Sequence, residues 1–272
     1  YAGWLVVEQR LRERFARLLG AAGPQDVALL KNTSEGLSFV AAGLDWEPGD
    51  NVVFPYQEFP SNRLPWEALA ARGVEPRAVD IGGGEPEARL LEACDARTRV
   101  LAVSAVQYAD GLRMDLPRLG DFCRSRETLL CVDAIQQLGV LPFDVAAVGA
   151  DFAMADGHKW LLGPEGVAAF WVRPELRERL ALVELGWHMV EHSGDYDRHD
   201  WQPAASARRF EAGSPNLLGT HGLEASLSLL EEVGMETVAD EVLGRTAYLA
   251  ERVASSPALE LVSSPEPARR AG

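Results

Sequence analysis

The sequence predicts an α/β fold in which a mainly parallel sheet is flanked by helices, giving three layers. Helical periodicity and short apolar runs alternate along the 272 residues, which is typical of a parallel sheet with crossover helices. The apolar run that ends at Val132 is followed directly by Asp133. Open sheets of this class carry ligand-binding residues at the carboxyl ends of their strands. The same pattern therefore predicts both the fold and the edge of the sheet where a site would lie.

The predicted elements follow one another along a large domain, residues 1–235. Apolar residues at helical spacing predict helices, and short apolar runs bounded by turn residues predict strands. The helices are Leu5–Leu19, Ser34–Leu44, Ser61–Arg72, Asp115–Arg126 and Thr220–Glu232. The strands are Asn51–Phe54, Val74–Val79, Val100–Val106, Thr128–Val132, Phe152–Ala155 and Val167–Val172.

A second, smaller domain is expected to begin at residue 236 and to remain incomplete at residue 272. A long helical pattern continues from Glu236 to Ser255, and Leu259–Val262 is expected to open one more strand. The first residue is Tyr1 rather than Met. We expect the chain to be part of a longer polypeptide.

Charge and cysteine content restrict the classes of partner. A formal net charge of −15 argues against nucleic acid and anionic membranes as partners, although a pocket can still be locally positive. No run approaches the roughly 18 apolar residues of a membrane helix. Cys94, Cys123 and Cys131 lack metal-ligand spacing, so we expect buried free thiols, no metal and a reducing cytoplasm.

A lysine follows the predicted strand Phe152–Ala155 in a tight turn, within the segment DGHKWLLGP (residues 156–164). A turn at a strand end holds the amine of Lys159 on rigid backbone, where it can condense with an aldehyde and later carry protons. The alternative is a solvated turn lysine. Trp160 and the two leucines after it favour a packed site, because a purely solvent-facing turn is not usually followed by such residues.

Asp133 ends an apolar strand in the segment LLCVDAIQ (residues 129–136). Burial of a carboxylate is costly unless it has a partner. A pyridinium nitrogen is such a partner, and each pKa unit by which the carboxylate favours its protonation corresponds to about 1.4 kcal/mol. The alternative is an Asp that caps a following helix. Lys159 follows Asp133 at a distance that allows the two to meet across neighbouring strands.

Two further segments are weaker taken alone. KNTSEG (residues 31–36) precedes a helical pattern, and the hydroxyls of Thr33 and Ser34 with free N–H groups at a helix start can bind phosphate. The same residues fit an ordinary N-cap, and both interpretations stay open. RFEAGSPN (residues 209–216) indicates only a polar loop before a helix.

Together, DAIQ, GHK and RFEAGSPN, in this order, resemble the class V aminotransferase family, which includes cysteine desulfurases, isopenicillin N epimerase-like proteins and kynureninases. The resemblance extends from about Leu29 to about Gly222. It implies a fold type I enzyme that uses pyridoxal 5'-phosphate and works as a homodimer. It assigns Lys159 to the Schiff base with the cofactor and Asp133 to the pyridine nitrogen.

The resemblance also implies the other cofactor contacts. Gln136 would lie near the phenolic oxygen, and His158 near the phosphate. Thr33 and Ser34 match the phosphate-binding turn, while Ser214 matches a residue that reaches the phosphate of the neighbouring subunit.

Some positions depart from the desulfurase pattern. Phe59 stands where desulfurases stack a histidine on the cofactor, and it can stack but cannot exchange protons. Tyr108 replaces an asparagine near the cofactor. Asp156 replaces a phosphate-contacting serine, and we expect it to turn outward or to contact His158. None of the three cysteines can be assigned the role of the desulfurase cysteine.

The sequence thus predicts a pyridoxal-phosphate enzyme, aminotransferase-like, that acts on a small amino acid or amine through Lys159. The alternatives are a cysteine desulfurase or C–S lyase, and a non-catalytic homologue of the fold. Arginines 63, 208 and 209 are candidates for binding a substrate carboxylate, and none is assigned. Trp187 and His188 are candidates for the substrate entrance, whereas His192 and His199 are expected to be solvated.

Overall fold

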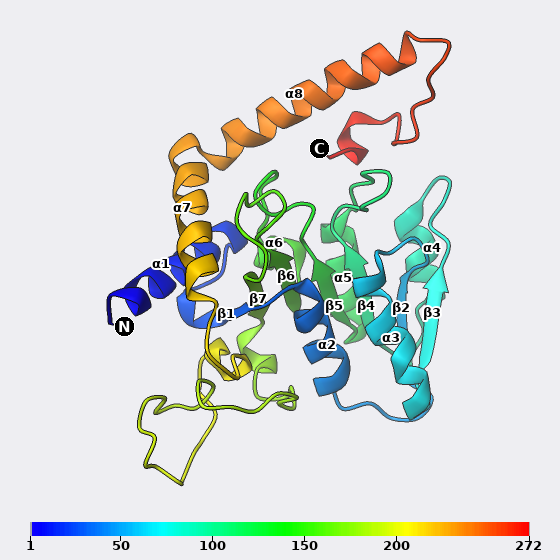
Figure 1. Cartoon of the computed structure of the whole chain (residues 1–272). Helices are drawn as coiled ribbons and strands as arrows, with labels where there is room; N and C mark the ends of the chain where they lie inside the picture. Colours follow the sequence, from blue (N-terminus) through cyan, green and yellow to red (C-terminus); the bar gives the residue numbers. More distant parts are fainter. Residues whose placement is uncertain (1, 272) are drawn as a thin grey trace.

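A single mixed sheet of seven strands organises the computed structural model, which describes residues 2–271 (Figure 1). The strands are β1 (Val27–Leu30), β2 (Asn51–Pro55), β3 (Glu75–Val79), β4 (Thr98–Ser104), β5 (Leu129–Asp133), β6 (Phe152–Asp156) and β7 (Ala168–Val172). Their order is β1-β7-β6-β5-β4-β2-β3. Strands β2 to β6 pair in parallel, and β7 is antiparallel to both β6 and β1. The predicted mainly parallel sheet is confirmed.

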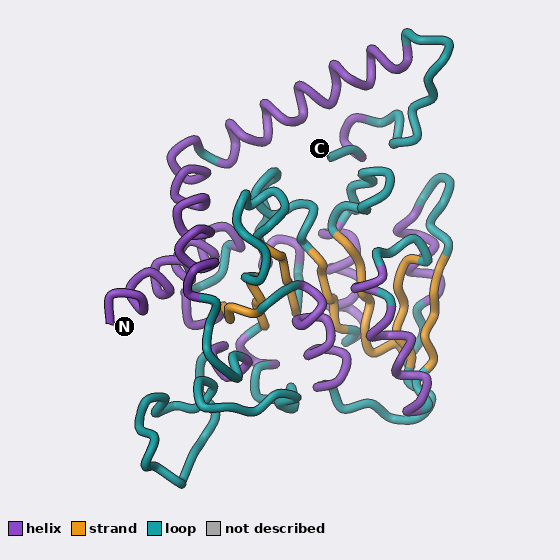
Figure 2. The backbone as a smooth tube through the Cα atoms, in the orientation of Figure 1, coloured by secondary structure: helices purple, strands orange, loops and turns teal. Residues whose placement is uncertain are grey.

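Helices lie on both faces of this sheet (Figures 1 and 2). They are α1 (Ala2–Leu19), α2 (Thr33–Gly43), α3 (Leu64–Ala68), α4 (Pro86–Ala93), α5 (Leu116–Arg126), α6 (Val145–Val148), α7 (Leu217–Val233) and α8 (Met235–Ala254). Among the described residues, no helix is long and apolar enough to cross a lipid bilayer.

Two hydrophobic cores explain the three layers. Along β5, Leu130 and Val132 belong to the core beneath α1, α5 and α7, while Leu129 and Cys131 belong to the core beneath α2 and α3. Successive side chains of a strand point to opposite faces, so a strand covered on both faces must be apolar throughout. This is why the strands appear in the sequence as continuous apolar runs.

Several predicted boundaries are wrong for identifiable reasons. The predicted helix Ser61–Arg72 is divided into a 3-10 turn, the short helix α3 and a second 3-10 turn, and Pro65 sits in the first turn of α3, where a missing N–H is tolerated. The predicted strand Leu259–Val262 does not form. Leu259 and Val262 are largely exposed, and within residues 2–271 no strand pairs with them.

The segment after α8 returns to the body of the protein. Helix α8 extends away from α7, and the chain then turns back toward the loop that follows β4 (Figure 1). A β-bridge joins Arg270 to Leu112, and the N–H of Arg113 donates to the carbonyl of Arg269 at 2.9 Å. The predicted helix after Glu236 is confirmed as α8.

Candidate functional site

Asp133 is the last residue of β5, at the carboxyl edge of the sheet. In the strand register it lies between Ser104 on β4 and Met154 on β6. Its side chain is 2% exposed, and Oδ1 accepts a hydrogen bond from the N–H of Ile135 at 3.0 Å. A turn rather than a helix follows, so the helix-capping alternative is wrong. Burial raises the pKa of Asp133 to about 7, and the negative charges of Glu58 and Asp156 add to this rise in pKa.

Lys159 lies in a turn directly after the neighbouring strand β6. The N–H of Leu162 donates to the carbonyl of Lys159 at 3.0 Å, and the N–H of Gly163 donates to the carbonyl of Gly157 at 2.8 Å. A side chain at Gly157 would come within 2.9 Å of the Val167 carbonyl, so the turn requires glycine. The Lys159 side chain is exposed. Lys159 therefore stands at the same edge of the sheet as Asp133, beyond the adjacent strand.

A hydrogen bond connects the two loops that carry these residues. The indole Nε1 of Trp160 donates to Oε1 of Gln136 at 3.2 Å. Gln136 and Trp160 also line a pocket of about 200 Å³ together with Tyr108. The structure thus brings together the turn of Lys159, the residues after Asp133 and the aromatic side chain of Tyr108.

Helix α2 begins beside the end of β6. Asn32, not Thr33 or Ser34, is the N-cap: its Oδ1 accepts from the N–H of Glu35 at 2.9 Å, and the Glu35 carboxylate accepts from the N–H of Lys31 at 2.6 Å. The ordinary N-cap interpretation of Thr33 and Ser34 is therefore wrong. Thr33 is buried, and its hydroxyl oxygen has no hydrogen-bond partner among the described residues.

Ser34 ties helix α2 to the loop after β2. Its hydroxyl donates to the hydroxyl of Ser61 at 2.7 Å. The same loop carries Phe59, whose ring packs edge to face against the ring of Tyr108, with 5.3 Å between ring centroids. Both rings are about half exposed, at 48% and 51%. Exposed aromatic rings at the edge of a sheet offer apolar faces to a flat ligand.

Asp156 behaves as the sequence predicts. Its Oδ1 lies 3.2 Å from Nδ1 of His158. Burial raises the pKa of Asp156, while His158 and the N–H groups of Gly157 and Thr33 act in the opposite direction. These contacts place the carboxylate of Asp156 among His158, the turn of Lys159 and the first turn of α2.

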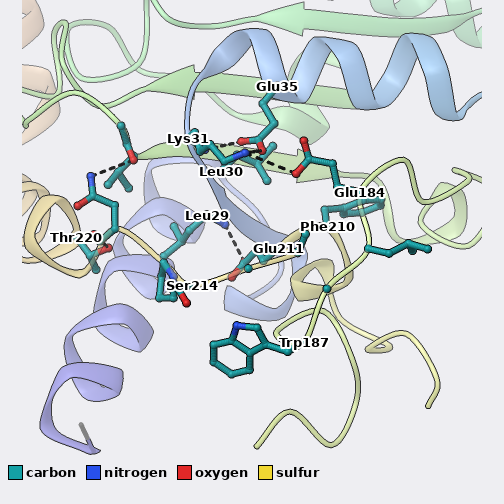
Figure 3. A pocket seen from close by; sticks show the side chains of 18 residues that line it. Leu29, Leu30, Lys31, Glu35, Glu184, Trp187, Phe210, Glu211, Ser214 and Thr220 are labelled. Carbon is teal, nitrogen blue, oxygen red and sulfur yellow. Dashed lines mark hydrogen bonds and ion pairs between the residues drawn. The ribbon is translucent and has the colours of Figure 1, made fainter. Parts of the chain in front are cut away.

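Ser214 lines a pocket to which neither Asp133 nor Lys159 contributes. This cavity, about 490 Å³, is the largest of those described (Figure 3). Lys31 pairs there with Glu35 at 2.9 Å and lies 3.6 Å from Glu184, and Trp187 lines the same cavity. Volume alone would point to this cavity. Its lysine pairs with two carboxylates, whereas the smaller pocket is lined by Gln136 and Trp160, from the loops that follow β5 and β6, so we place the site at the ends of these two strands.

A buried ion cluster underlies the largest cavity. The guanidinium of Arg12 donates to both oxygens of Glu211 and, at 2.5 Å, to Glu8. Nδ1 of His188 is 3.6 Å from the Glu211 carboxylate, and Glu211 also accepts from the N–H of Leu29 at 2.9 Å (Figure 3). Glu8, His188 and Glu211 could in principle bind a metal. Arg12 already supplies a positive charge to both carboxylates, which accounts for the cluster without one.

The candidate carboxylate-binding arginines are differently placed. Arg208 donates to the carbonyls of His188 and Val190 and to the Ser193 hydroxyl, so its guanidinium is used within its own loop. Arg63 lies 3.6 Å from Glu67. Neither contact identifies a substrate arginine.

Sequence reasoning missed Glu58, Ser104 and Gln107. Glu58 accepts from the N–H of Ser104 at 2.6 Å, from its hydroxyl, and from Nε2 of Gln107 at 2.9 Å. Glu58 follows the buried strand β2 closely, just as Asp133 ends β5. The same strand-end rule that identified Asp133 could have found it.

Comparisons with known proteins identify the family and the fold of the chain. The family model described as aminotransferase class-V matches residues 6–272. A probable cysteine desulfurase of Methanothermobacter thermautotrophicus is 35% identical over 95% of this chain and 64% of its own length, and a cysteine desulfurase of Klebsiella pneumoniae is 31% identical over 97% and 65%. The chain thus spans about two thirds of the length of these relatives. An uncharacterized aminotransferase of Bacillus subtilis is 32% identical over 85% of the chain and 60% of its own length.

Solved structures show the same fold. The cysteine desulfurase CsdA of Escherichia coli superposes with a TM-score of 0.83 at 28% identity, covering 94% of this chain and 65% of that one. Apo cysteine desulfurase of Thermococcus onnurineus gives 0.87 at 24% identity, covering 99% and 67%. At that identity the likeness supports the fold alone. The family resemblance and the fold class predicted from the sequence are confirmed.

Proposed function

Because the chain belongs to the aminotransferase class-V family, whose cofactor is pyridoxal 5'-phosphate, we propose that it is part of an enzyme that acts on a small amino acid through Lys159. One observation carries the proposal. Asp133 is a buried carboxylate without a cationic partner among the described residues, one strand away from an exposed lysine. Such a carboxylate suits a protonated ring nitrogen, which would supply the missing positive charge.

The residues present fit the cofactor at a second point. The unpartnered hydroxyl of Thr33 and the N–H groups at the start of α2 offer donors for a phosphate, and His158 lies near them. Gln136, Phe59 and Tyr108 would contact the ring and its substituents. When bound, pyridoxal phosphate supplies an aldehyde that captures amines and a ring that withdraws electrons from the substrate α-carbon.

Side chains of this protein would then have separate roles in the reaction. Asp133 would hold a proton on the ring nitrogen. The Nζ of Lys159 would hold the cofactor between turnovers, and after release it would take and return the α-proton of the substrate. Ser34 and the turn around Gly157 would fix the orientation of the phosphate end.

The chain offers a sharp test, because it contains two lysines, Lys31 and Lys159. We expect pyridoxal phosphate to produce a visible absorption band, and borohydride reduction followed by peptide mapping should place the label on Lys159. Lys159→Ala should abolish the band, whereas Lys31→Arg, the matched control, should retain it. Labelling at Lys31 alone, or absence of a band in the parent, would refute the proposal.

Cleavage of a C–S bond is the second candidate reaction, and it is now better supported than the transamination that the sequence alone favoured. The relatives named cysteine desulfurase favour it. Cys123 and Cys131 are buried, and burial raises the pKa of the half-buried Cys94 thiol to about 11. None of these thiols is a ready sulfur acceptor. Transfer of sulfur to a persulfide would need a thiol other than these three, whereas elimination needs none and would convert cysteine and water to pyruvate, ammonia and sulfide.

Product assays separate the alternatives. Release of sulfide with pyruvate would indicate elimination. Formation of alanine with enzyme-bound sulfur would indicate a desulfurase. A new keto acid, formed without sulfide, would indicate transamination. Cys94→Ser should leave sulfide release unchanged. No turnover of any amino acid by a protein that binds the cofactor would favour the non-catalytic alternative.

We also propose the assembly and the domain division. Ser214 is exposed and lies apart from Lys159, as expected if it serves the cofactor of a second copy in a homodimer. Helix α8 and the residues after it would begin a smaller domain over residues 236–272. Free cysteines suit a reducing compartment such as the cytoplasm.

A further inference from the structure

Glu58 is a buried carboxylate at the carboxyl edge of the sheet, just after β2. Its side chain is 4% exposed. It lies close enough to Asp133 for its charge to raise the pKa of that residue. The proposed reaction assigns no step to Glu58, and its burial therefore requires another explanation.

The hydrogen bonds of Glu58 join two chain segments. Oε1 accepts from the N–H of Ser104 at 2.6 Å and from Nε2 of Gln107 at 2.9 Å, while Oε2 accepts from the hydroxyl of Ser104. Glu58 belongs to the loop after β2, and its partners belong to the end of β4 and the loop beyond it. One carboxylate thus cross-links the ends of two neighbouring strands.

The two aromatic residues beside the site are the immediate neighbours of this cross-link. Phe59 follows Glu58, and Tyr108 follows Gln107. Their rings meet edge to face at 5.3 Å with an interplanar angle of 76°. Because both rings are about half exposed, packing alone holds them weakly, and the backbone on each side must be fixed by other contacts.

Burying the carboxylate of Glu58 costs desolvation energy that an apolar side chain at this position would not cost. Burial raises its pKa, and the opposing hydrogen bonds come from neutral donors rather than from a cation. Neutral donors fix geometry without neutralising the charge. The arrangement is therefore better explained by what it positions than by the stability it contributes.

We propose that Glu58 is a positioning residue of the cofactor site, and that its cross-link between the β2 and β4 ends holds Phe59 and Tyr108 in the edge-to-face pair that would contact the cofactor ring. This inference rests on the proposed function, since it presumes that the cofactor binds at this edge. Glu58 acts through the two rings and is not assigned contact with substrate.

The test compares three variants of the full chain, titrated as apoprotein with pyridoxal phosphate and followed by visible absorption and visible circular dichroism. Glu58→Leu leaves three donors without an acceptor. We expect about tenfold weaker cofactor binding and a dichroic signal per bound cofactor reduced by about half. Glu58→Gln keeps a carbonyl oxygen for two donors, and its amide can donate to the Ser104 hydroxyl. It should bind within about threefold of the parent and retain the dichroism.

Asp151→Ala is the matched control for loss of a buried carboxylate. Asp151 precedes β6 at the opposite end of the sheet, is 5% exposed, and accepts from the N–H of Leu130 at 2.7 Å. It should lower the melting temperature without changing cofactor affinity or dichroism. If Glu58→Leu does not fold, Gln107→Leu removes one donor and should weaken binding by about threefold.

The outcomes separate this inference from the proposed function. A parent protein without a Lys159-dependent band would overturn both. A parent with the band, but with Glu58→Leu or Gln107→Leu indistinguishable from it in affinity and dichroism, would overturn the positioning role alone. Equal losses in Asp151→Ala would show a general effect of stability and would also overturn it.

Discussion

At the scale of single residues, the structure shows two groups whose burial is unfavourable without a ligand. Asp133 is a buried carboxylate with one hydrogen-bond donor, and Thr33 is a buried hydroxyl with none among the described residues. Each can be removed by a nearly isosteric substitution. Because the group is unfavourable without a ligand, its removal should stabilise the apoprotein while lowering its affinity for the cofactor.

Asp133→Asn should stabilise the apoprotein at neutral to alkaline pH. The folded state holds a proton on Asp133 up to a pKa of about 7, whereas the unfolded state loses it near 3.8. The folded state thus binds more protons across this window, and the contribution of Asp133 to the free energy of unfolding falls as pH rises from about 4 to about 7. Asn removes this loss, which is on the order of 4 kcal/mol.

Urea unfolding of both apoproteins at about pH 5 and about pH 8 checks this expectation. The variant should gain relative to the parent mainly at the higher pH, while its affinity for pyridoxal phosphate falls. A difference between variant and parent that is the same at both pH values would contradict the assigned pKa.

Thr33→Val should leave the stability of the apoprotein unchanged or raise it by about 1 kcal/mol, since it removes a hydroxyl that lacks a partner. Cofactor affinity, measured by spectroscopic titration, should fall about tenfold if that hydroxyl donates to the phosphate. Ser38→Ala, an exposed position on the same helix whose hydroxyl bonds to the Ser34 carbonyl, serves as the control. Unchanged affinity in Thr33→Val would remove Thr33 from the phosphate site.

At the scale of elements, the sequence predicted what depends on local pattern and missed what depends on tertiary partners. Continuous apolar runs predicted β5 and β6 almost to the residue, because strands covered on both faces must be apolar. Strand β1 is four residues long and is defined by its antiparallel pairing with β7, which no local pattern reveals. The same limitation produced the incorrect strand at Leu259–Val262.

The candidate site follows the same division. The strand ends placed Asp133, and the turn after β6 placed Lys159, because both depend on short local segments. The Glu58 cross-link was missed because its partners lie 46 and 49 residues away in sequence. The sequence offered Thr33 or Ser34 as an N-cap, whereas Asn32 is the cap, since all three residues suit a cap by type and only the backbone distinguishes them.

The Arg12 cluster joins helix α1 to the RFEAGSPN segment, and we expect it to be a major contribution to their association. Arg12 is buried between Glu8 and Glu211. Arg12→Met leaves two buried carboxylates without a cation and should cost about 3–5 kcal/mol in urea unfolding. Arg17→Met, on the same helix but largely exposed, should cost less than about 1 kcal/mol.

A double-mutant cycle tests the assignment further. Adding Glu211→Gln to Arg12→Met removes one of the stranded charges, so the double variant should be more stable than the sum of the single losses predicts. Additive losses would mean that Arg12 stabilises the protein through its packed side chain rather than through the ion pairs.

At the scale of the whole molecule, an ion pair attaches the segment that follows α8 to the body of the protein. Arg269 donates to both oxygens of the buried Glu87 at 2.8 and 2.9 Å, and the Arg269 carbonyl and the Arg270 bridge attach to the loop that bears Tyr108. The stretch between α8 and this attachment is largely exposed. The C-terminal segment is therefore held chiefly at its far end, next to the candidate site.

Arg269→Ala should release this segment while the sheet remains folded. Because the bidentate pair is partly buried, we expect docking of the C-terminal segment to weaken by about 1–3 kcal/mol. Limited proteolysis should then cleave faster between residues 255 and 266, with little change in the global unfolding midpoint. Arg118→Ala provides the control, because Arg118 pairs with Glu85 at 3.3 Å on the exposed surface nearby. Since the segment abuts Gly111 and Leu112, its release should also loosen the Tyr108 loop and lower the visible dichroism of bound cofactor. Unaltered cleavage in Arg269→Ala would show that the β-bridge, rather than the ion pair, holds the segment in place.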